Sequence, residues 1–378
     1  MQQERHVLVT PSLQHNVLAD ALRLAALSLS LSNPNPRVGC IIVGSDGRVL
    51  GQGHTQRAGG PHAEIMALRD ASAKGNGVKG ATVCVTLEPC SHHGRTSPCC
   101  EALTAAGIKK VVASIADPDP RVSGLGFERL RAAGIEVDVG VGAAESRELN
   151  IGFFSRMIRR TPWVRLKVAA SLDGVTALAS GQSQWITSAA ARLDGHTWRA
   201  RACAVLTGIG TVLQDNPRLN VRDVDAPRQP HLVIVDSRLD TPLGARLFSS
   251  GRVIFIYTAM KNDAKQKALE AAGATVVVLP GAGNKVDLTA MLLDLGGREV
   301  NELHVEAGSK LNGSLISAGL VDEYLVYLAP TLLGPGLSMA ALPALSALSE
   351  STQLEFKSLD LLGRDLRVVA RGLGRDQF

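Results

Sequence analysis

The chain has 378 residues, of which 45% are hydrophobic and 20% are charged, and its net charge is +5 at pH 7. This length exceeds one ordinary domain of about 100 to 200 residues, so we expect two soluble globular domains. The basic residues are spread along the chain and only 3% of residues are aromatic, which excludes a nucleic-acid groove and favours a small phosphorylated metabolite as the partner.

The N-terminal residues 1–11 contain neither an apolar core nor a cleavage-like site, so we expect no secretory signal. Apolar residues then recur at helical spacing over 15–30 and predict a helix. The runs 38–43 and 48–53 predict a β-hairpin. No stretch reaches the roughly 18 apolar residues that a membrane-spanning helix needs, so we expect no membrane partner. The six cysteines are too few and too unevenly spaced for a disulfide framework, so we expect a reduced cytoplasmic location.

Further along, strands and helices alternate in an α/β pattern. The first half predicts helices over 62–73, from about 99 and over 124–134, with strands over 81–87, 110–115 and 135–139. We place the domain boundary between 150 and 162, which gives domains at 12–155 and 162–375. The second half predicts strands over 163–170, 203–207, 231–235, 252–258, 274–279, 301–306 and 322–328, helices over 188–200, 262–272, 287–295 and 309–318, and a closing pair of strands within 352–372.

A metal site is predicted in the first half. His62 and Glu64 open a predicted helix, and Cys90 and Cys99 follow the strand over 81–87. One imidazole and two thiolates leave a fourth tetrahedral position on zinc open for water, as in catalytic sites. Zinc acidifies such a water, and Glu64 could carry its proton to the substrate nitrogen and the leaving amine. His-x-Glu followed by Pro-Cys-x-x-Cys is typical of zinc deaminases.

The cysteine spacing leaves alternatives open. Eight residues separate Cys90 from Cys99, where the deaminase pattern has two, and Cys100 is a second candidate ligand. Cys99 keeps a proline directly before it, so we prefer it. His92 or His93 could be a fourth ligand, which would make the zinc structural. The residues could also be unrelated buried side chains, but the joint pattern favours catalysis.

Seven segments resemble the bifunctional riboflavin-biosynthesis deaminase/reductase family. Those similar to its deaminase half are Asn33-Pro-Asn-Pro-Arg-Val-Gly-Cys40, His62-Ala-Glu64 and Thr86-Leu-Glu-Pro-Cys-Ser-His-His-Gly-Arg-Thr-Ser-Pro-Cys99. Those similar to its reductase half are Lys167-Val-Ala-Ala-Ser-Leu-Asp-Gly174, Ser180-Gly-Gln-Ser-Gln-Trp-Ile-Thr187, Asp215-Asn-Pro-Arg-Leu219 and Val305-Glu-Ala-Gly308. The resemblance implies a cytidine-deaminase-like three-layer N-terminal domain and a dihydrofolate-reductase-like C-terminal domain.

The resemblance also implies two consecutive steps on one phosphorylated pyrimidine. Zinc-dependent hydrolysis removes the ring amino group at C2 of 2,5-diamino-6-(5-phosphoribosylamino)pyrimidin-4(3H)-one as ammonia. NADPH then reduces the ribosyl group to a ribityl chain. One Zn²⁺ per chain and NADPH are the implied cofactors. The implied deaminase residues are the zinc ligands His62, Cys90 and Cys99, the proton shuttle Glu64, and Asn35 with the 91–96 loop around the pyrimidine.

For the reductase, the resemblance implies a nucleotide site and a substrate site. The nucleotide site comprises Ala169, Trp185, Thr211, Asp215, Ser237 and the turn that runs from Gly308 and Ser309 to Ser314. The substrate site comprises Ser183, Arg199, Leu219, Arg222 and Glu306. A glycine that follows a strand and opens a helix at Gly308 favours phosphate binding. Arg199 and Arg222 are candidates for a bidentate grip on the sugar phosphate.

Some positions depart from the family or add to it. Ile209 stands where a small polar residue is commoner, and Asn216 and Asn220 replace aspartate and threonine. Arg238, after Ser237, could accept a 2′-phosphate and favour NADPH. We further expect Lys167, beside Asp173, to orient the substrate, and exposed strand edges to favour a homodimer or higher homo-oligomer.

Two other functions remain as alternatives. One is a zinc nucleobase deaminase with an unrelated C-terminal nucleotide-binding domain. The other is a zinc-stabilised binding protein, which removal of the metal would unfold.

Overall fold

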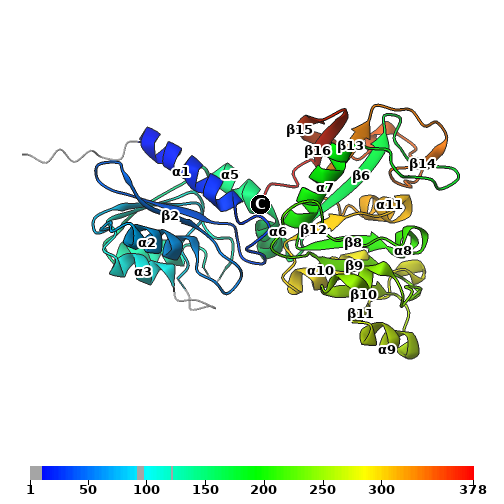
Figure 1. Cartoon of the computed structure of the whole chain (residues 1–378), viewed down its shortest axis with the longest axis horizontal. Helices are drawn as coiled ribbons and strands as arrows, with labels where there is room; N and C mark the ends of the chain where they lie inside the picture. The colour runs from blue at the N-terminus through cyan, green and yellow to red at the C-terminus, as the bar shows by residue number, and fades with distance from the viewer. Residues whose placement is uncertain (1–10, 92–97, 121) are drawn as a thin grey trace, which may run out of the picture. The chain divides into compact units, whose positions relative to one another are not determined.

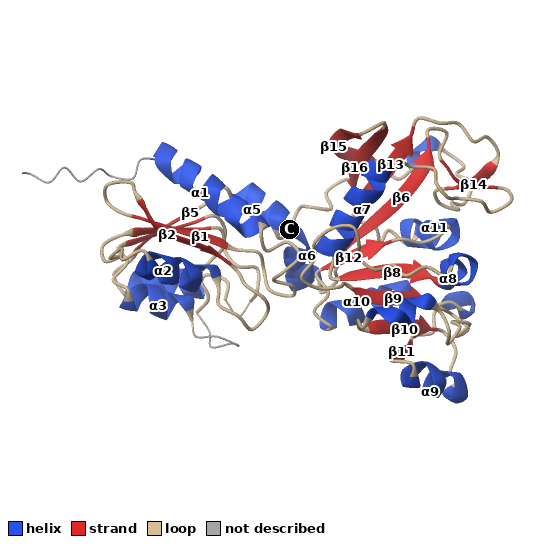
Figure 2. Cartoon of the chain, in the orientation of Figure 1, coloured by secondary structure: helices blue, strands red, loops and turns tan. Residues whose placement is uncertain are grey.

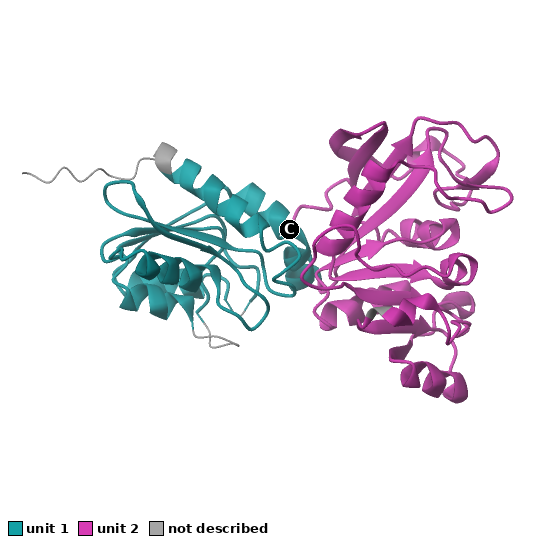
Figure 3. Cartoon of the chain, viewed as in Figure 1, with its two compact units in different colours: residues 1–159 teal, residues 160–378 magenta. Residues whose placement is uncertain are grey.

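The computed structural model describes residues 11–91, 98–120 and 122–378. The chain divides into two compact units, residues 1–159 and 160–378 (Figure 3). Both units alternate strands and helices as the sequence predicts (Figure 1). Among the described residues, no helix is long and apolar enough to cross a bilayer.

The first unit is built on one five-stranded sheet, in the order β2-β1-β3-β4-β5. β1 pairs antiparallel with β2 and β3, and the pairs from β3 to β5 are parallel. The strands are β1 (Gly39–Val43), β2 (Val49–His54), β3 (Thr82–Val85), β4 (Lys110–Ala113) and β5 (Glu136–Val139). The helices are α1 (Pro11–Ala26), α2 (Ala63–Ala73), α3 (Cys99–Ala105), α4 (Leu125–Ala132), α5 (Ala143–Leu149) and α6 (Ile151–Arg159).

Two glycines let helices approach this sheet on opposite faces. A Cβ on Gly39 would lie 1.9 Å from the carbonyl oxygen of Ala21 in α1, and one on Gly51 would lie 2.3 Å from that of Ala67 in α2. Any larger residue would push the helix away. The first unit is therefore three layers with α1 and α2 on opposite sides of the sheet (Figure 2). This packing places the start of α2 beside the sheet.

The second unit contains a nine-stranded sheet, in the order β11-β10-β9-β8-β12-β6-β13-β16-β15, and a separate pair β14-β7. The strands are β6 (Trp163–Ser171), β7 (Val175–Leu178), β8 (Ala204–Gly208), β9 (His231–Val235), β10 (Ile254–Thr258), β11 (Ala274–Val278), β12 (Glu302–Val305), β13 (Glu323–Ala329), β14 (Gly336–Ser338), β15 (Leu354–Leu362) and β16 (Asp365–Gly372). The helices are α7 (Ala189–Arg201), α8 (Ile209–Asp215), α9 (Asp263–Ala271), α10 (Leu288–Gly297) and α11 (Ser309–Ser317), and 3₁₀ turns span Arg246–Ser250, Ala282–Asn284 and Leu348–Glu350.

The seven strands from β11 to β13 run parallel, and β16 is antiparallel to both its neighbours. Two apolar clusters cover the two faces of the parallel part: Leu206 on β8 joins one and Val205 joins the other. A parallel sheet buried on both faces explains the continuous apolar runs of its strands. Ligands bind such sheets at the carboxyl ends of the strands, and here β8 and β12 end beside the middle of β6.

The structure differs from the predictions mainly at short elements and helix ends. The first helix ends at Ala26, not at 30, because the N–H groups of Leu27 and Ser28 bond to carbonyls three residues back. The Ser28 hydroxyl bonds to the carbonyl of Thr55 at 2.8 Å, a serine contact that competes with helix. β7, α8 and β14 were not predicted.

Candidate active sites

Three side chains of the first unit converge on one point. His62 caps the start of α2, Cys90 comes after β3, and Cys99 is the first residue of α3. Nδ1 of His62 lies 3.5 Å from Sγ of Cys90 and 3.3 Å from Sγ of Cys99. A tetrahedral zinc with bonds of about 2.0 Å to nitrogen and 2.3 Å to sulfur holds such atoms about 3.5 Å apart. The three side chains therefore fit a zinc ion.

The neighbouring cysteine points elsewhere. Sγ of Cys100 lies 3.2 Å from the carbonyl oxygen of Pro89 and 3.5 Å from that of Gly126, and burial raises the pKa of this thiol to about 12. In contrast, hydrogen bonding to Cys99 and His62 lowers the pKa of Cys90, and the amide of Cys99 donates to the Cys90 sulfur at 3.3 Å. Cys90 is thus the thiol readiest to become a metal-binding thiolate.

Glu64 lies next to the cluster in the first turn of α2 and is 4% exposed. Burial, reinforced by the charge of Cys90, raises the pKa of Glu64 to about 7. A carboxyl group with a pKa near neutrality can both accept and donate a proton. The arrangement therefore places a proton carrier beside three potential zinc ligands.

Other expected deaminase residues are placed less directly. Asn35 lies in the loop before β1, where its N–H donates to the carbonyl of Ser32 at 2.9 Å. Of the expected 91–96 loop, the structure describes only Ser91, so the alternative ligands His92 and His93 lie outside the described residues.

Sequence reasoning missed Glu88, which organises the backbone beside Cys90. The buried carboxylate of Glu88 accepts N–H groups of Asp117 at 3.1 Å, Gly124 at 2.9 Å and Gly126 at 2.8 Å. A carboxylate that bonds three backbone amides fixes their loop strongly. The only sequence signal was its place directly before Pro89 and Cys90.

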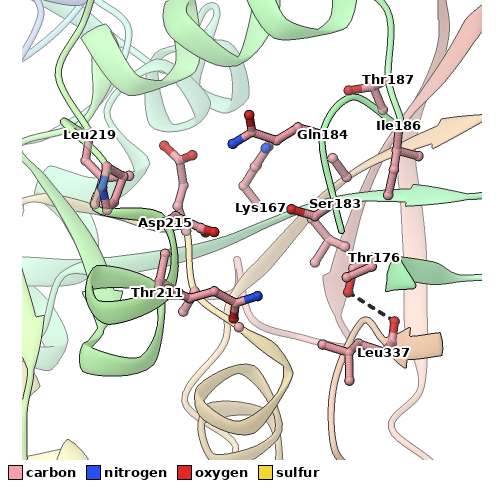
Figure 4. Close-up of a pocket in the computed structure, with 18 of the residues that line it drawn as sticks. Lys167, Thr176, Ser183, Gln184, Ile186, Thr187, Thr211, Asp215, Leu219 and Leu337 are labelled. Atoms are coloured by element: carbon pink, nitrogen blue, oxygen red, sulfur yellow. Dashed lines mark hydrogen bonds between the residues drawn. The ribbon is translucent and has the colours of Figure 1, made fainter. Parts of the chain in front are cut away.

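The second unit has a cavity of about 620 Å³ (Figure 4), lined by Lys167–Ala169 within β6, by residues of α8, which follows β8, and by Glu306 directly after β12. The expected nucleotide residues that line it are Ala169, Trp185, Thr211, Asp215, Gly308 and Ser309. All the expected substrate residues line it as well, namely Ser183, Arg199, Leu219, Arg222 and Glu306. Two expected nucleotide residues do not. Ser314 is exposed on α11, and Ser237 follows β9, with its Oγ 3.4 Å from the amide of Val286.

An ion pair dominates the charge inside this cavity. Nε and Nη2 of Arg199 donate to the two carboxylate oxygens of Glu306 at 2.7 and 2.9 Å, and Nη1 donates to the carbonyl of Asn220 at 2.6 Å. Burial alone would raise the pKa of Glu306, but the charges of Arg199 and Lys167 outweigh it and lower the pKa. The guanidinium group of Arg199 is thus engaged by Glu306, whereas the side chain of Arg222 is exposed.

Lys167 and Asp173, expected side by side, have separate surroundings. Lys167 points into the cavity together with Asp215 and Gln184 (Figure 4), and burial lowers its pKa against the opposing charge of Glu306. Asp173 instead accepts the N–H groups of Leu333 at 3.2 Å and Gly334 at 2.8 Å. Asp173 therefore holds a turn, and only Lys167 faces the cavity.

The three departures from the family pattern each have a local structural role. Asn216 ends α8 with φ of 40°, a conformation that asparagine tolerates well, and its Oδ1 accepts the N–H of Arg246 at 2.9 Å. The carbonyl of Asn220 accepts from Arg199 at 2.6 Å. Ile209 begins α8 and packs against an apolar cluster. In the described part of the chain, none of these three residues is among those that line the cavity.

Several cavity residues were missed, some of them because their elements were not predicted. Gln214 comes from α8 and Leu337 from β14, and Met339, Arg192 and Arg246 also line the cavity. Leu337 is held by the hydroxyl of Thr176, which donates to its carbonyl at 3.1 Å (Figure 4). No sequence motif marked these positions.

Two family models match the chain. The cytidine and deoxycytidylate deaminase zinc-binding region matches residues 11–115, and the RibD C-terminal domain matches residues 162–368. Riboflavin biosynthesis protein RibD of Escherichia coli strain K12 is 44% identical over 358 residues, which cover 92% of this chain and 96% of the relative. The protein of the same name from Aquifex aeolicus is 41% identical over 351 residues, which cover 93% and 96%.

Solved structures agree with these matches. Form 1 of Acinetobacter baumannii RibD has a TM-score of 0.88 and 38% identity, with 96% of this chain and 99% of that chain covered. A diaminohydroxyphosphoribosylaminopyrimidine deaminase/5-amino-6-(5-phosphoribosylamino)uracil reductase from Thermotoga maritima has a TM-score of 0.84 and 32% identity, with the same coverage.

These matches confirm the expected fold class, a zinc-binding deaminase domain followed by a reductase domain, together with Zn²⁺ and NADPH as cofactors. They also exclude an unrelated C-terminal domain. The chain belongs to the RibD family of bifunctional deaminase/reductases of riboflavin biosynthesis.

Proposed function

We propose that the chain deaminates 2,5-diamino-6-(5-phosphoribosylamino)pyrimidin-4(3H)-one and then uses NADPH to reduce the ribosyl group of the product to a ribityl chain. The Thermotoga maritima relative carries both activities in its name, which supports this substrate. The observation that carries the proposal is the cluster of His62, Cys90 and Cys99 beside Glu64 in a chain whose second unit holds a charged cavity.

For the deaminase step we propose that His62, Cys90 and Cys99 hold the zinc ion. Zinc bound there supplies Lewis acidity that makes water nucleophilic near neutral pH. Glu64 carries two protons in turn: it takes one from the water and delivers it to the pyrimidine nitrogen, and it then takes one from the hydroxyl added at C2 and delivers it to the leaving amine. The carbon–nitrogen bond at C2 breaks, water adds its oxygen there, and ammonia leaves. The burial of Glu64 supports this role because it keeps bulk water from competing.

For the reductase step we propose that Lys167 orients the sugar of the substrate. We also propose that Arg199 holds the carboxylate of Glu306 in the orientation in which it contacts the substrate. Both charged groups face the cavity, and the ion pair keeps the carboxylate ionised. Arg222 and Ser183 would hold the sugar phosphate, because the exposed guanidinium of Arg222 is available for bidentate contact. Arg199 acts on the substrate through Glu306 and is a positioning residue.

The nucleotide would lie along Ala169, Trp185, Thr211, Asp215, Gly308 and Ser309. Gly308 caps α11, a helix of nine residues, whose free N–H groups suit a phosphate. Ser237 and the exposed Arg238 at the end of β9 are proposed to take the 2′-phosphate of NADPH outside the cavity. Arg238→Ala should then narrow the preference for NADPH over NADH, and an unchanged preference would remove Arg238 from this role.

We also propose a homodimer that forms through the edge strand β15. Three apolar side chains of this strand are widely exposed: Phe356 is 67%, Leu361 77% and Leu359 57% exposed. An exposed edge with such side chains favours pairing with a second copy. Light scattering should give the mass of a dimer for the wild type and of a monomer for Leu361→Glu; a monomeric wild type would reject the proposal.

The test of the main proposal measures ammonia release and NADPH oxidation by zinc-loaded protein supplied with the diaminopyrimidinone ribotide. We expect both signals, with NADPH oxidation dependent on prior deamination. Ammonia alone would reject the proposed reductase substrate, and NADPH oxidation alone would reject the proposed deaminase substrate. A chelator-treated sample should lose the ammonia signal while the second unit still oxidises NADPH with the deaminated product.

A further inference from the structure

One aromatic side chain at the cavity is unusually exposed. Trp185 lines the cavity and is 65% exposed, whereas Trp163 of the same unit is fully buried. An indole is large and mainly apolar, so this exposure leaves much apolar surface in water. Apolar surface at the mouth of a cavity is typical of a group that a ligand covers.

The partner of this indole is Arg192. Its guanidinium carbon lies 4.5 Å from the ring centroid of Trp185, well within the range of a cation–π contact. Nη1 of Arg192 also donates to the carbonyl oxygen of Thr187 at 2.7 Å. One side chain in the first turn of α7 therefore holds both the indole and the backbone that follows it.

Arg192 also shares a helix face with Arg199. The two arginines lie seven residues apart on α7, which is about two helical turns, and both line the cavity. Glu306 neutralises Arg199, whereas in the described part of the chain no carboxylate forms a salt bridge with Arg192. Arg199 therefore holds Glu306 inside the cavity, whereas Arg192 carries a positive charge at the mouth of the cavity that no carboxylate of the described residues neutralises.

We propose that Arg192 is a positioning residue of the reductase that holds Trp185 over the mouth of the cavity, so that the pair closes over bound NADPH. The segment that bears Trp185 follows one side of the cavity, with Ser183 and Gln184 pointing inward (Figure 4). The indole therefore lies where it can cover a nucleotide. This inference rests on the proposed assignment of Trp185 to the nucleotide site.

The expected effect is on cofactor affinity rather than on turnover. A cation–π contact at an exposed site changes an equilibrium constant about two- to fivefold, and the hydrogen bond to Thr187 adds to it. We expect Arg192→Ala to raise the KM and the Kd for NADPH about three- to tenfold and to leave kcat within about twofold. Arg192→Lys should recover little of this loss, because a lysine keeps the charge but lacks the planar guanidinium that stacks on the ring.

The experiment uses the zinc-loaded full-length protein. KM and kcat are measured for Arg192→Ala, for Arg192→Lys and for Lys267→Ala, a control that removes an exposed cation on α9 away from the cavity. The Kd for NADPH is followed by quenching of tryptophan fluorescence, and Trp185→Phe identifies the part of the signal that comes from Trp185. Urea unfolding followed by tryptophan fluorescence shows that the second unit of each preparation is folded, because Trp163, Trp185 and Trp198 all belong to that unit.

The outcomes separate this inference from the proposed function. The double variant Arg192→Ala/Trp185→Ala is measured as well. If its KM for NADPH is no higher than the raised KM of Arg192→Ala, the two residues act together, which supports the inference. Full recovery in Arg192→Lys means that charge alone acts, which overturns it. An active Arg192→Ala enzyme whose KM and Kd for NADPH equal those of the wild type overturns the inference as well. A wild type that binds NADPH but oxidises none with the deaminated product contradicts the proposed function instead.

Discussion

His304 lies within the central strand β12 and is 0% exposed, and within the described residues neither of its ring nitrogens has a hydrogen-bond partner. Burial lowers the pKa of His304 to about 3, and the positive charge of Arg165 adds to this although Glu306 opposes it. In the unfolded chain an imidazole titrates near pH 6.5. Because the pKa is lower in the folded state, stability is complete above about pH 6.5 and is lost as the pH falls towards 3.

The size of this loss follows from the two pKa values. Protonation of the unfolded state at pH 5 lowers the free energy of unfolding by about 2 kcal/mol relative to pH 8, for this one group. His304→Leu removes the effect, because leucine fills a similar volume and does not titrate. At pH 8 we expect the variant to be as stable as the wild type or about 1 kcal/mol more stable, since a buried imidazole that makes no hydrogen bond within the described residues, and whose Nε2 lies 3.6 Å from Glu306, is replaced by an apolar group.

The assay is urea unfolding followed by tryptophan fluorescence at several pH values. All three tryptophans, Trp163, Trp185 and Trp198, belong to the second unit, so the signal reports on that unit and is insensitive to loss of zinc from the first. The difference in free energy of unfolding between variant and wild type should grow by about 2 kcal/mol from pH 8 to pH 5. A difference that stays constant over this range would refute the reasoning.

Three further predictions concern the two sites. Glu64→Gln should keep its zinc yet lower the deamination rate at least about 100-fold, with reductase activity unchanged; near-normal deamination would remove Glu64 from the mechanism. Cys99→Ala should lose zinc in metal analysis and Cys100→Ala should retain it; the reverse result would exchange their roles. Glu306→Gln should lower the stability of the second unit by about 3 to 5 kcal/mol, because Arg199 is left as a buried unpaired charge; an unchanged urea midpoint would contradict this.

The deaminase site was largely predictable because its motif residues lie close together in the sequence and next to predicted elements. His62 and Glu64 lie on one turn, and Cys90 follows directly after a strand, so local order already places them together. The choice between Cys99 and Cys100 could not be settled from the sequence. Adjacent residues in a helix point about 100° apart, and only the contacts of Cys100 with two carbonyl groups show which way that turn faces.

The reductase cavity was predictable only in part. Elements such as α8 and β14 have seven and three residues, which is too short for a periodic pattern. The pairing of Arg199 with Glu306 joins positions 107 residues apart, so a local pattern gives no sign that this guanidinium is already engaged. The sequence motif therefore suggested a phosphate grip where the fold places an internal ion pair.

The pairing of β6 sets the order in which the second unit can be completed during synthesis. β6 begins this unit, yet its two neighbours are β12 and β13, and its Arg165 pairs with Glu323, 158 residues later. At about 5 to 20 residues per second, a ribosome needs roughly 8 to 30 s to make that length. For most of this time, until β12 is made, the central strand has no permanent partner on either edge, a situation that invites aggregation. Nascent chains that stall before β13 should therefore depend on chaperones, whereas the deaminase unit, already complete, can fold.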